Sequence, residues 1–210
     1  MKERPILFSG SMVRALLAGT KTQTRRVAKP VRHPDLGNVY APGALVLEHE
    51  PQHVIDRCCP YGRPGDRLWV REAFMHEPAD FCWEASVSVP CRPAETVYRA
   101  DFPNSQPGEG WKPSIHMPRN LSRILLEITS VHVERLQDIS EADALAEGVP
   151  HSLNLPGGRF ARENFEHLWW TINGDGSWES NPWVWVVEFK RVQQASSGRP
   201  SQLEEAPCSA

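Results

Sequence analysis

Proline is the feature that most constrains this chain, because it occupies 19 of 210 positions, against an ordinary share of about 5%. A proline inside a helix removes a backbone hydrogen bond and clashes with the preceding turn. The sequence therefore argues against a helical bundle or a long coiled coil and favours strands, turns and irregular loops. Hydrophobic residues make up 40% of the chain, which is enough for the core of one globular domain with insertions.

The apolar pattern predicts a mixed fold in which strands outnumber helices. Helices are expected over 12–18, 139–148 and 159–172, and strands over 68–72, 97–100, 122–136 and 182–192. Ser140 and Asp143 form a capping-box pattern, and Thr129-Ser130 marks an irregularity in the third strand. Without regular βαβ alternation, we expect an α+β fold: a small β-barrel with short helices packed across it.

The domain is expected to span 1–192. Residues 30–64 and 76–120 are rich in proline and glycine or weakly patterned, so we interpret them as insertions and loops. The polar tail, 193–210, is predicted to be disordered.

Charge is unevenly distributed along the chain. Residues 1–34 carry a net charge of +7 and the remainder carries -10, which leaves -3 overall. A basic segment on an acidic body indicates a local anion site and not a protein that coats nucleic acid. A solvated basic face is the simpler alternative.

Location and metal binding are predicted mainly from features that the sequence lacks. No apolar run is long enough for a secretory signal or a membrane span, and five irregularly spaced cysteines fit reduced thiols, so we expect a cytoplasmic protein. His49, His53, Cys58 and Cys59 lie close together, but Pro51 interrupts the histidine pair and adjacent cysteines do not match a C-x₂-C motif. No metal and no cofactor is predicted.

Two places in the sequence can carry acid–base chemistry. Residues 21–26 (KTQTRR) supply an amine, hydroxyls and fixed cations, and the neighbouring arginines should lower the pKa of Lys21. Glu147 lies in the last turn of its helix, where its charge opposes the helix dipole. The alternatives are ordinary: Lys21 as a dipole partner of the preceding helix, and Glu147 as a solvated side chain.

A proline-stiffened loop, 111–119 (WKPSIHMPR), places an aromatic side chain beside cations. Such a loop can stack a base and hold a phosphate, or it can be a packed loop in which Trp111 fills a gap. We expect these side chains to line the pocket above Lys21 together with a neighbouring Tyr-Arg pair. The predicted substrate- or nucleic-acid-binding residues are Arg25, Arg26, Tyr98, Arg99, Trp111, His116 and Arg119.

Several motifs together resemble the ASCH domain, a member of the PUA-like β-barrel superfold. They are AGTKTQTR at 18–25, PGD at 64–66, Glu147 near the end of its helix, and WVVEFK at 185–190. Three more resemble phage- and prophage-associated ASCH proteins: CPYG at 59–62, WKPSIHMP at 111–118 and NPWVW at 181–185. The resemblance spans roughly 4–192.

The resemblance implies an activity, because small bacterial ASCH proteins include amidohydrolases that deacetylate N4-acetylcytidine. Their catalytic lysine, threonine and glutamate correspond to Lys21, Thr24 and Glu147. Lys21 would take a proton from Thr24, whose oxygen attacks the amide, Glu147 would protonate the leaving amine, and backbone N–H groups or Arg26 would stabilise the oxyanion. This chain is much longer than those enzymes.

Two other functions stay open at this stage. The chain can be a non-catalytic module that binds RNA or a nucleotide, or a phage accessory protein that binds a protein partner. The expected ligand is a nucleoside, a nucleotide or a short single-stranded RNA, and no membrane partner is expected. The enzyme requires Lys21, Thr24 and Glu147 to converge on one pocket, whereas the RNA module requires an open basic groove.

Overall fold

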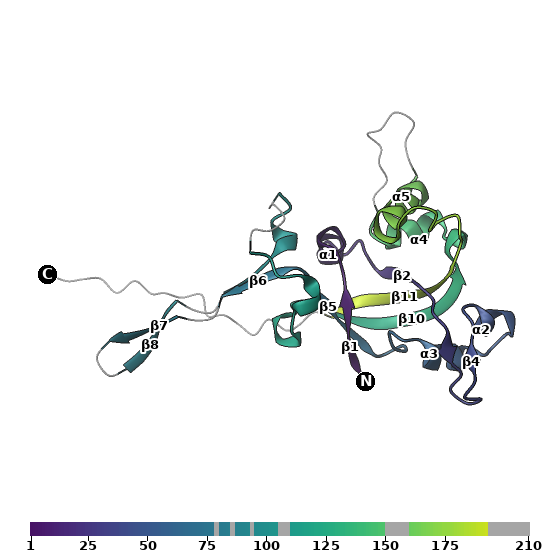
Figure 1. Cartoon of the computed structure of the whole chain (residues 1–210), viewed down its shortest axis with the longest axis horizontal. Helices are drawn as coiled ribbons and strands as arrows, with labels where there is room; N and C mark the ends of the chain where they lie inside the picture. The colour runs from purple at the N-terminus through teal and green to yellow at the C-terminus, as the bar shows by residue number, and fades with distance from the viewer. Residues whose placement is uncertain (78–79, 85–86, 93–94, 105–109, 150–159, 193–210) are drawn as a thin grey trace.

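The computed structural model (Figure 1) describes residues 1–77, 80–84, 87–92, 95–104, 110–149 and 160–192. The predicted disorder of 193–210 therefore concerns residues outside the described ranges.

A five-stranded sheet in the order β1-β5-β10-β11-β2 forms the centre of the fold. Its strands are β1 (Glu3–Leu7), β2 (Gln23–Val27), β5 (Arg67–Arg71), β10 (Leu125–Arg135) and β11 (Trp183–Val192). β1 runs parallel to β5, and the other neighbours are antiparallel. The predicted mixed, mainly β architecture is confirmed.

The expected closed barrel is not found. Among the described residues, β1 and β2 remain the two edges of the sheet, with no backbone pairing between them. The chain passes from β1 to β2 through α1 (Gly10–Leu17), whose buried Val13 and Leu16 join the same core as Ile6 of β1. Helix packing thus covers this part of the core where a closed barrel would need strand pairing.

Three smaller strand pairs extend from the sheet. They are β3 (Val31–Arg32) with β4 (Val39–Tyr40), β6 (Phe74–Glu77) with β9 (Glu95–Tyr98), and β7 (Asp80–Glu84) with β8 (Val87–Arg92). The last two pairs overlap the predicted insertion 76–120, with β6 beginning two residues before it, and they project away from the sheet in Figure 1. This insertion is therefore built partly from β-hairpins.

Short helices surround the sheet. Besides α1 they are α2 (Ala44–Leu47), α3 (Gln52–Cys58), α4 (Glu141–Ala146) and α5 (Ala161–Asn173), and the 3₁₀ turns are η1 (Arg99–Asp101), η2 (Ser114–His116), η3 (Arg119–Leu121) and η4 (Leu136–Asp138). The interpretation of 30–64 as a loop was incomplete, because α2 and α3 lie there. α3 buries Val54, Ile55 and Cys58, a triplet too short to show helical periodicity in the sequence.

Local sequence signals explain the elements that carry the site. The register of β10 against β11 shifts between Ile128 and Ser130, so the predicted irregularity is confirmed. The Ser140 hydroxyl accepts a hydrogen bond from the Asp143 backbone N–H, and the Asp143 carboxylate accepts one from the Ser140 backbone, which confirms the capping box of α4.

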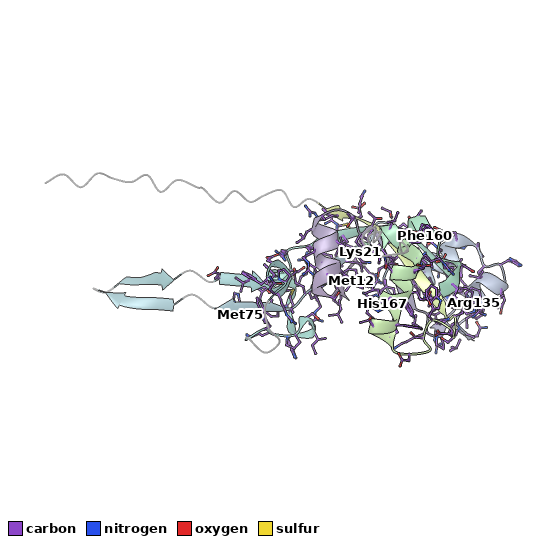
Figure 2. All side chains as sticks on the ribbon, turned by 90° about the horizontal axis from the view of Figure 1, so that it is seen from above. Met12, Lys21, Met75, Arg135, Phe160 and His167 are labelled. Atoms are coloured by element: carbon purple, nitrogen blue, oxygen red, sulfur yellow. The ribbon has the colours of Figure 1, made fainter. Side chains whose placement is uncertain are left out.

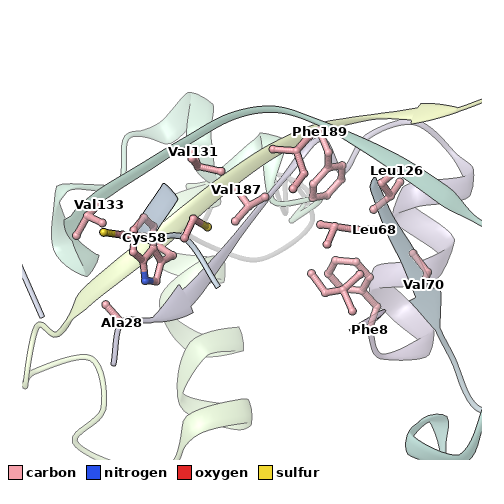
Figure 3. Close-up of a cluster of buried hydrophobic side chains, with 14 of the residues drawn as sticks. Phe8, Ala28, Cys58, Leu68, Val70, Leu126, Val131, Val133, Val187 and Phe189 are labelled. Carbon is pink, nitrogen blue, oxygen red and sulfur yellow. The ribbon is translucent and has the colours of Figure 1, made fainter. Parts of the chain in front are cut away.

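Two hydrophobic clusters make up the core. The larger lies between the sheet, α1 and α3, and Figure 3 shows Phe8, Leu68 and Phe189 gathered at one end and Cys58 at the other. The smaller joins α4 and α5 to the sheet around Trp169 and its neighbours. Within the described ranges no helix is long and apolar enough to cross a membrane, and no group of three or more His, Cys, Asp or Glu residues could hold a metal ion.

Candidate active site

Lys21 and Glu147 form a buried ion pair between the end of α1 and the end of α4. The Lys21 ammonium donates hydrogen bonds to the Glu147 carboxylate (Nζ to Oε2, 2.7 Å) and to the Glu147 carbonyl oxygen (2.8 Å). The two side chains are 0% and 3% exposed. Residues 126 positions apart in the sequence are thus brought into direct contact, with Lys21 beside α1 in Figure 2.

The backbone around this pair is shaped by two glycines. Gly19, at φ +77°, turns the chain after α1, and the Lys21 backbone N–H donates to the Ala15 carbonyl. Gly148, at φ +83°, ends α4 at a point where a Cβ atom would lie 2.8 Å from the Ala15 Cβ and 2.9 Å from the Lys21 Cβ. A side chain at position 148 would push α4 away from Lys21.

Burial lowers the pKa of Lys21, and the charges of Arg26 and Arg25 lower it further, while the Glu147 carboxylate opposes both effects. The predicted direction is therefore correct, but its main cause is desolvation. The like-charge effect of the arginines is smaller. A lysine that is less costly to deprotonate is better suited to act as a base.

Arg25 holds the carboxylate side of the site in place. Its guanidinium lies 2.7 Å from Glu134, 3.2 Å from Glu147 and 3.7 Å from Asp143, and its side chain is 1% exposed. These contacts occupy the cation with carboxylates of its own chain. The prediction that Arg25 binds substrate is not supported by this arrangement, which makes Arg25 a positioning residue for Glu147.

A pocket of about 60 Å³ opens beside the pair, between β2 and α5; we call it the β2–α5 pocket. Thr24, Arg26 and Glu147 line its polar wall. The opposite wall is apolar and aromatic and comes from Met12, Phe165, Leu168, Trp169 and Ile172. A volume of this size accepts a small planar group or a few water molecules.

Arg26 lies on the side of this pocket that faces β1. Its guanidinium donates to the Leu7 carbonyl (2.7 Å) and is 5.4 Å from the centre of the Phe8 ring. The Lys21 ammonium is 5.5 Å from the same ring. Phe8 therefore presents its π system to both cations.

The remaining predicted binding residues do not line the β2–α5 pocket. The Tyr98 hydroxyl donates to Leu121, Trp111 packs against Phe102 with ring centres 6.0 Å apart, and Arg119 pairs with Glu3. His116 is exposed on η2, and Arg99 lines a different cavity on the other side of α1. The expectation that this group surrounds Lys21 is wrong, because the β6–β9 hairpin places its end beside η3 instead.

Sequence reasoning missed the α5 wall and the carboxylates around Arg25. Phe165, Leu168 and Trp169 lie on one face of the helix predicted over 159–172, but a core face and a pocket wall have the same helical pattern. Glu134 alternates with buried residues on β10, and Asp143 was identified only as a cap. No local signal indicated that both would meet Arg25.

Comparisons with protein-family models, with curated proteins and with solved structures found no match for this chain.

Proposed function

We propose that this protein is an amidohydrolase of the ASCH type, with an open PUA-like sheet, that cleaves the N-acyl amide of a modified nucleoside or nucleotide. The observation that carries the proposal is the buried contact of 2.7 Å between Lys21 and Glu147, at the edge of a pocket that Thr24 also lines. An amine, a hydroxyl and a carboxylate in one desolvated site are the groups that acyl transfer requires.

The ion pair can supply a base and an acid at the same time. With the shared proton on Glu147, Lys21 is a neutral amine that accepts the Thr24 proton while Thr24 Oγ attacks the amide carbon. Glu147 gives its proton to the leaving amine as the C–N bond breaks, which leaves an acyl-threonine ester. Arg26, on the pocket wall, is the side-chain candidate to stabilise the oxyanion.

The second half of the cycle restores the starting state. A water molecule attacks the ester and gives a proton to the Glu147 carboxylate, and the Lys21 ammonium returns its proton to Thr24 Oγ as the carboxylic acid leaves. Lys21 is then neutral again and Glu147 is protonated, so the only net change is hydrolysis of the amide.

The two walls of the β2–α5 pocket fit such a substrate. The α5 wall, with Leu168 and Trp169, can cover the face of a heteroaromatic ring, while the β2 wall presents polar groups to its acylated edge. An RNA-binding groove at this site would need free cations, yet Lys21 and Arg25 are buried and paired with carboxylates. This pairing favours the enzyme over the RNA module.

The test is turnover of N4-acetylcytidine by the purified protein, followed by chromatography. We expect cytidine and acetate from the wild type, and a loss of kcat/KM of about 10³-fold or more in Thr24→Val, which removes the hydroxyl but keeps the shape. Thr24→Ser should retain part of the activity. Thr22→Val, on an exposed neighbour, is the matched control.

Two results would contradict the proposal: no turnover by folded wild type, or full activity in Thr24→Val. Binding of the nucleoside without hydrolysis would assign the pocket to the non-catalytic module instead.

A further inference from the structure

A second cavity, of about 380 Å³, lies between the start of α1 and η1; we call it the α1–η1 cavity. Hydroxyl groups line it from Ser9 and Ser11 at the start of α1 and from Ser114 on η2. Arg14 of α1 and Arg99 of η1 also line it. Cations and hydroxyl donors from three separate segments therefore share one concave surface, and none of them takes part in the Lys21 site.

Among the described residues, no carboxylate pairs with either arginine of this cavity. Arg14 donates one hydrogen bond, to the Ala100 carbonyl (3.3 Å), and within the described ranges neither Arg14 nor Arg99 forms a salt bridge. A backbone carbonyl carries no net charge. The positive charge of both side chains is thus available to an anion.

Glu72 is the carboxylate that lines this cavity, and it is already compensated. It is 2% exposed, and the Arg123 guanidinium donates to both of its oxygens, at 2.9 and 3.0 Å. Arg123 also holds Asp101 at 2.7 Å. The three arginines (Arg14, Arg99 and Arg123) and the two acids (Glu72 and Asp101) together carry one net positive charge, which favours an anionic ligand.

The start of α1 adds neutral donors at the same surface. Ser9, the N-cap residue, makes no side-chain cap hydrogen bond; its hydroxyl lies 3.1 Å from the Ser11 hydroxyl instead. Backbone N–H groups in the first turn of a helix have no partner within the helix. They can therefore assist the arginines in binding an oxyanion.

An aromatic side chain completes the cavity. Phe102 lines it, is 50% exposed, and packs on its other side near Trp111. An exposed ring beside arginines and hydroxyls gives the cavity an apolar wall next to its cations. Phe8 lines the cavity as well and contacts Lys21, so the cavity adjoins the proposed catalytic pair.

We propose that the α1–η1 cavity binds the phosphate group of a mononucleotide, through Arg14, Arg99 and the serine hydroxyls. Phosphate recognition follows from the cavity itself; that the nucleotide is also the hydrolysed substrate rests on the proposed function. In that case the enzyme prefers an N-acylated nucleotide to the free nucleoside.

The experiment measures binding to the whole protein by calorimetry, with inorganic phosphate, cytidine 5′-monophosphate and cytidine as separate probes. The test variant is the double substitution Arg14→Gln/Arg99→Gln. The matched control is Lys29→Gln/Arg32→Gln, which removes two exposed cations elsewhere and changes the net charge equally. Circular dichroism verifies that both variants are folded.

We expect saturable binding of the monophosphate, weakened about tenfold or more in the test variant and unchanged in the control. Inorganic phosphate should compete with it, whereas cytidine should bind equally to all three proteins. Absence of saturable monophosphate binding to the wild type, or equal weakening in both variants, would overturn the assignment.

The outcomes also separate the two proposals. Arginine-dependent nucleotide binding without any amide hydrolysis would retain the phosphate site and reject the enzyme. Amide hydrolysis at the same rate with and without a 5′-phosphate, in a protein that does not bind phosphate, would retain the enzyme and reject the phosphate site.

Discussion

The β2–α5 pocket and the α1–η1 cavity lie on either side of α1 and differ in how their cationic side chains are paired. Around the first, Lys21 and Arg25 are buried, and within the described ranges their salt bridges are with Glu134, Asp143 and Glu147. Around the second, Arg14 and Arg99 line a larger space and form no salt bridge within the described ranges. Buried, paired charges hold a geometry and can exchange protons, whereas accessible, uncompensated charges can bind an anion.

The largest expected effect comes from breaking the buried pair. Lys21→Met leaves the Glu147 carboxylate in a dry site, where Arg25 is its remaining salt-bridge partner among the described residues. The free energy of unfolding, measured by urea denaturation, should therefore fall by about 3 kcal/mol or more. The double variant Lys21→Met/Glu147→Leu removes both charges and should recover most of that loss. A single-variant cost below about 1 kcal/mol would contradict the contrast between the two regions.

A smaller decrease in the free energy of unfolding is expected from Arg25→Lys. An ammonium group cannot reproduce the simultaneous contacts with Glu134 and Glu147, so unfolding should become easier by about 2 kcal/mol. Arg191→Lys is the matched control, because Arg191 is exposed and donates to the Leu17 carbonyl, and it should be neutral. Equal stability of the two variants would show that the guanidinium of Arg25 is not needed to hold Glu134 and Glu147 in place.

The carboxylates of the first region also predict a pH dependence. Burial tends to raise the pKa of Glu134, but its hydrogen bonds and charge interactions with His132 and Arg25 outweigh this and lower it. The ionised form therefore stabilises the fold above the ordinary glutamate pKa of about 4.3, and this stability is lost as pH falls through the lower folded-state pKa. Glu134→Gln should cost about 1 kcal/mol at pH 7.

Urea denaturation between pH 3 and 7 verifies this sign, on a grid of roughly one pH unit. The difference between wild type and Glu134→Gln should shrink on the acid side, while Glu179→Gln, at an exposed glutamate, should show no comparable trend. A difference that grows toward low pH would contradict the assigned direction.

The smallest effect is expected in the second region. Arg14→Gln/Arg99→Gln removes no ion pair, so the free energy of unfolding should change by less than about 0.5 kcal/mol. Thermal denaturation measures it, with Lys29→Gln/Arg32→Gln as the comparison. A loss above about 1.5 kcal/mol would mean that these arginines support the fold, and the contrast with the buried pair would disappear.

The expectations that hold best are those that depend on neighbours in the sequence. The cap of α4 is a contact between residues three positions apart, and the β10 irregularity occurs where the alternation of apolar residues breaks. Both depend on residues close together in the sequence, so the local pattern predicts them directly. Residue chemistry singles out Lys21 and Glu147, and the resemblance adds Thr24 as the nucleophile. How the three are placed relative to one another lies outside what local patterns can specify.

The expectations that failed required long-range geometry. The aromatic and cationic character of Tyr98 and Arg119 suggests a place in the Lys21 pocket. Instead, the Tyr98 hydroxyl donates to the Leu121 carbonyl, and Arg119 forms a salt bridge with Glu3. Barrel closure failed for the same reason, since pairing of β1 with β2 depends on how α1 packs between them. Where a hairpin or a helix comes to lie is a property of the packed core.

The sequence by itself determined a proline-rich, mainly β domain, its capped helices, and the chemical types available at positions 21–26 and 147, because these follow from local backbone preferences and residue chemistry. Only the tertiary structure decided that Lys21 meets Glu147 across 126 positions, that Arg25 faces three carboxylates, and that Arg14 and Arg99 share an open cavity. Burial and pairing of charge depend on the whole fold, and they separate the region suited to catalysis from the region suited to binding.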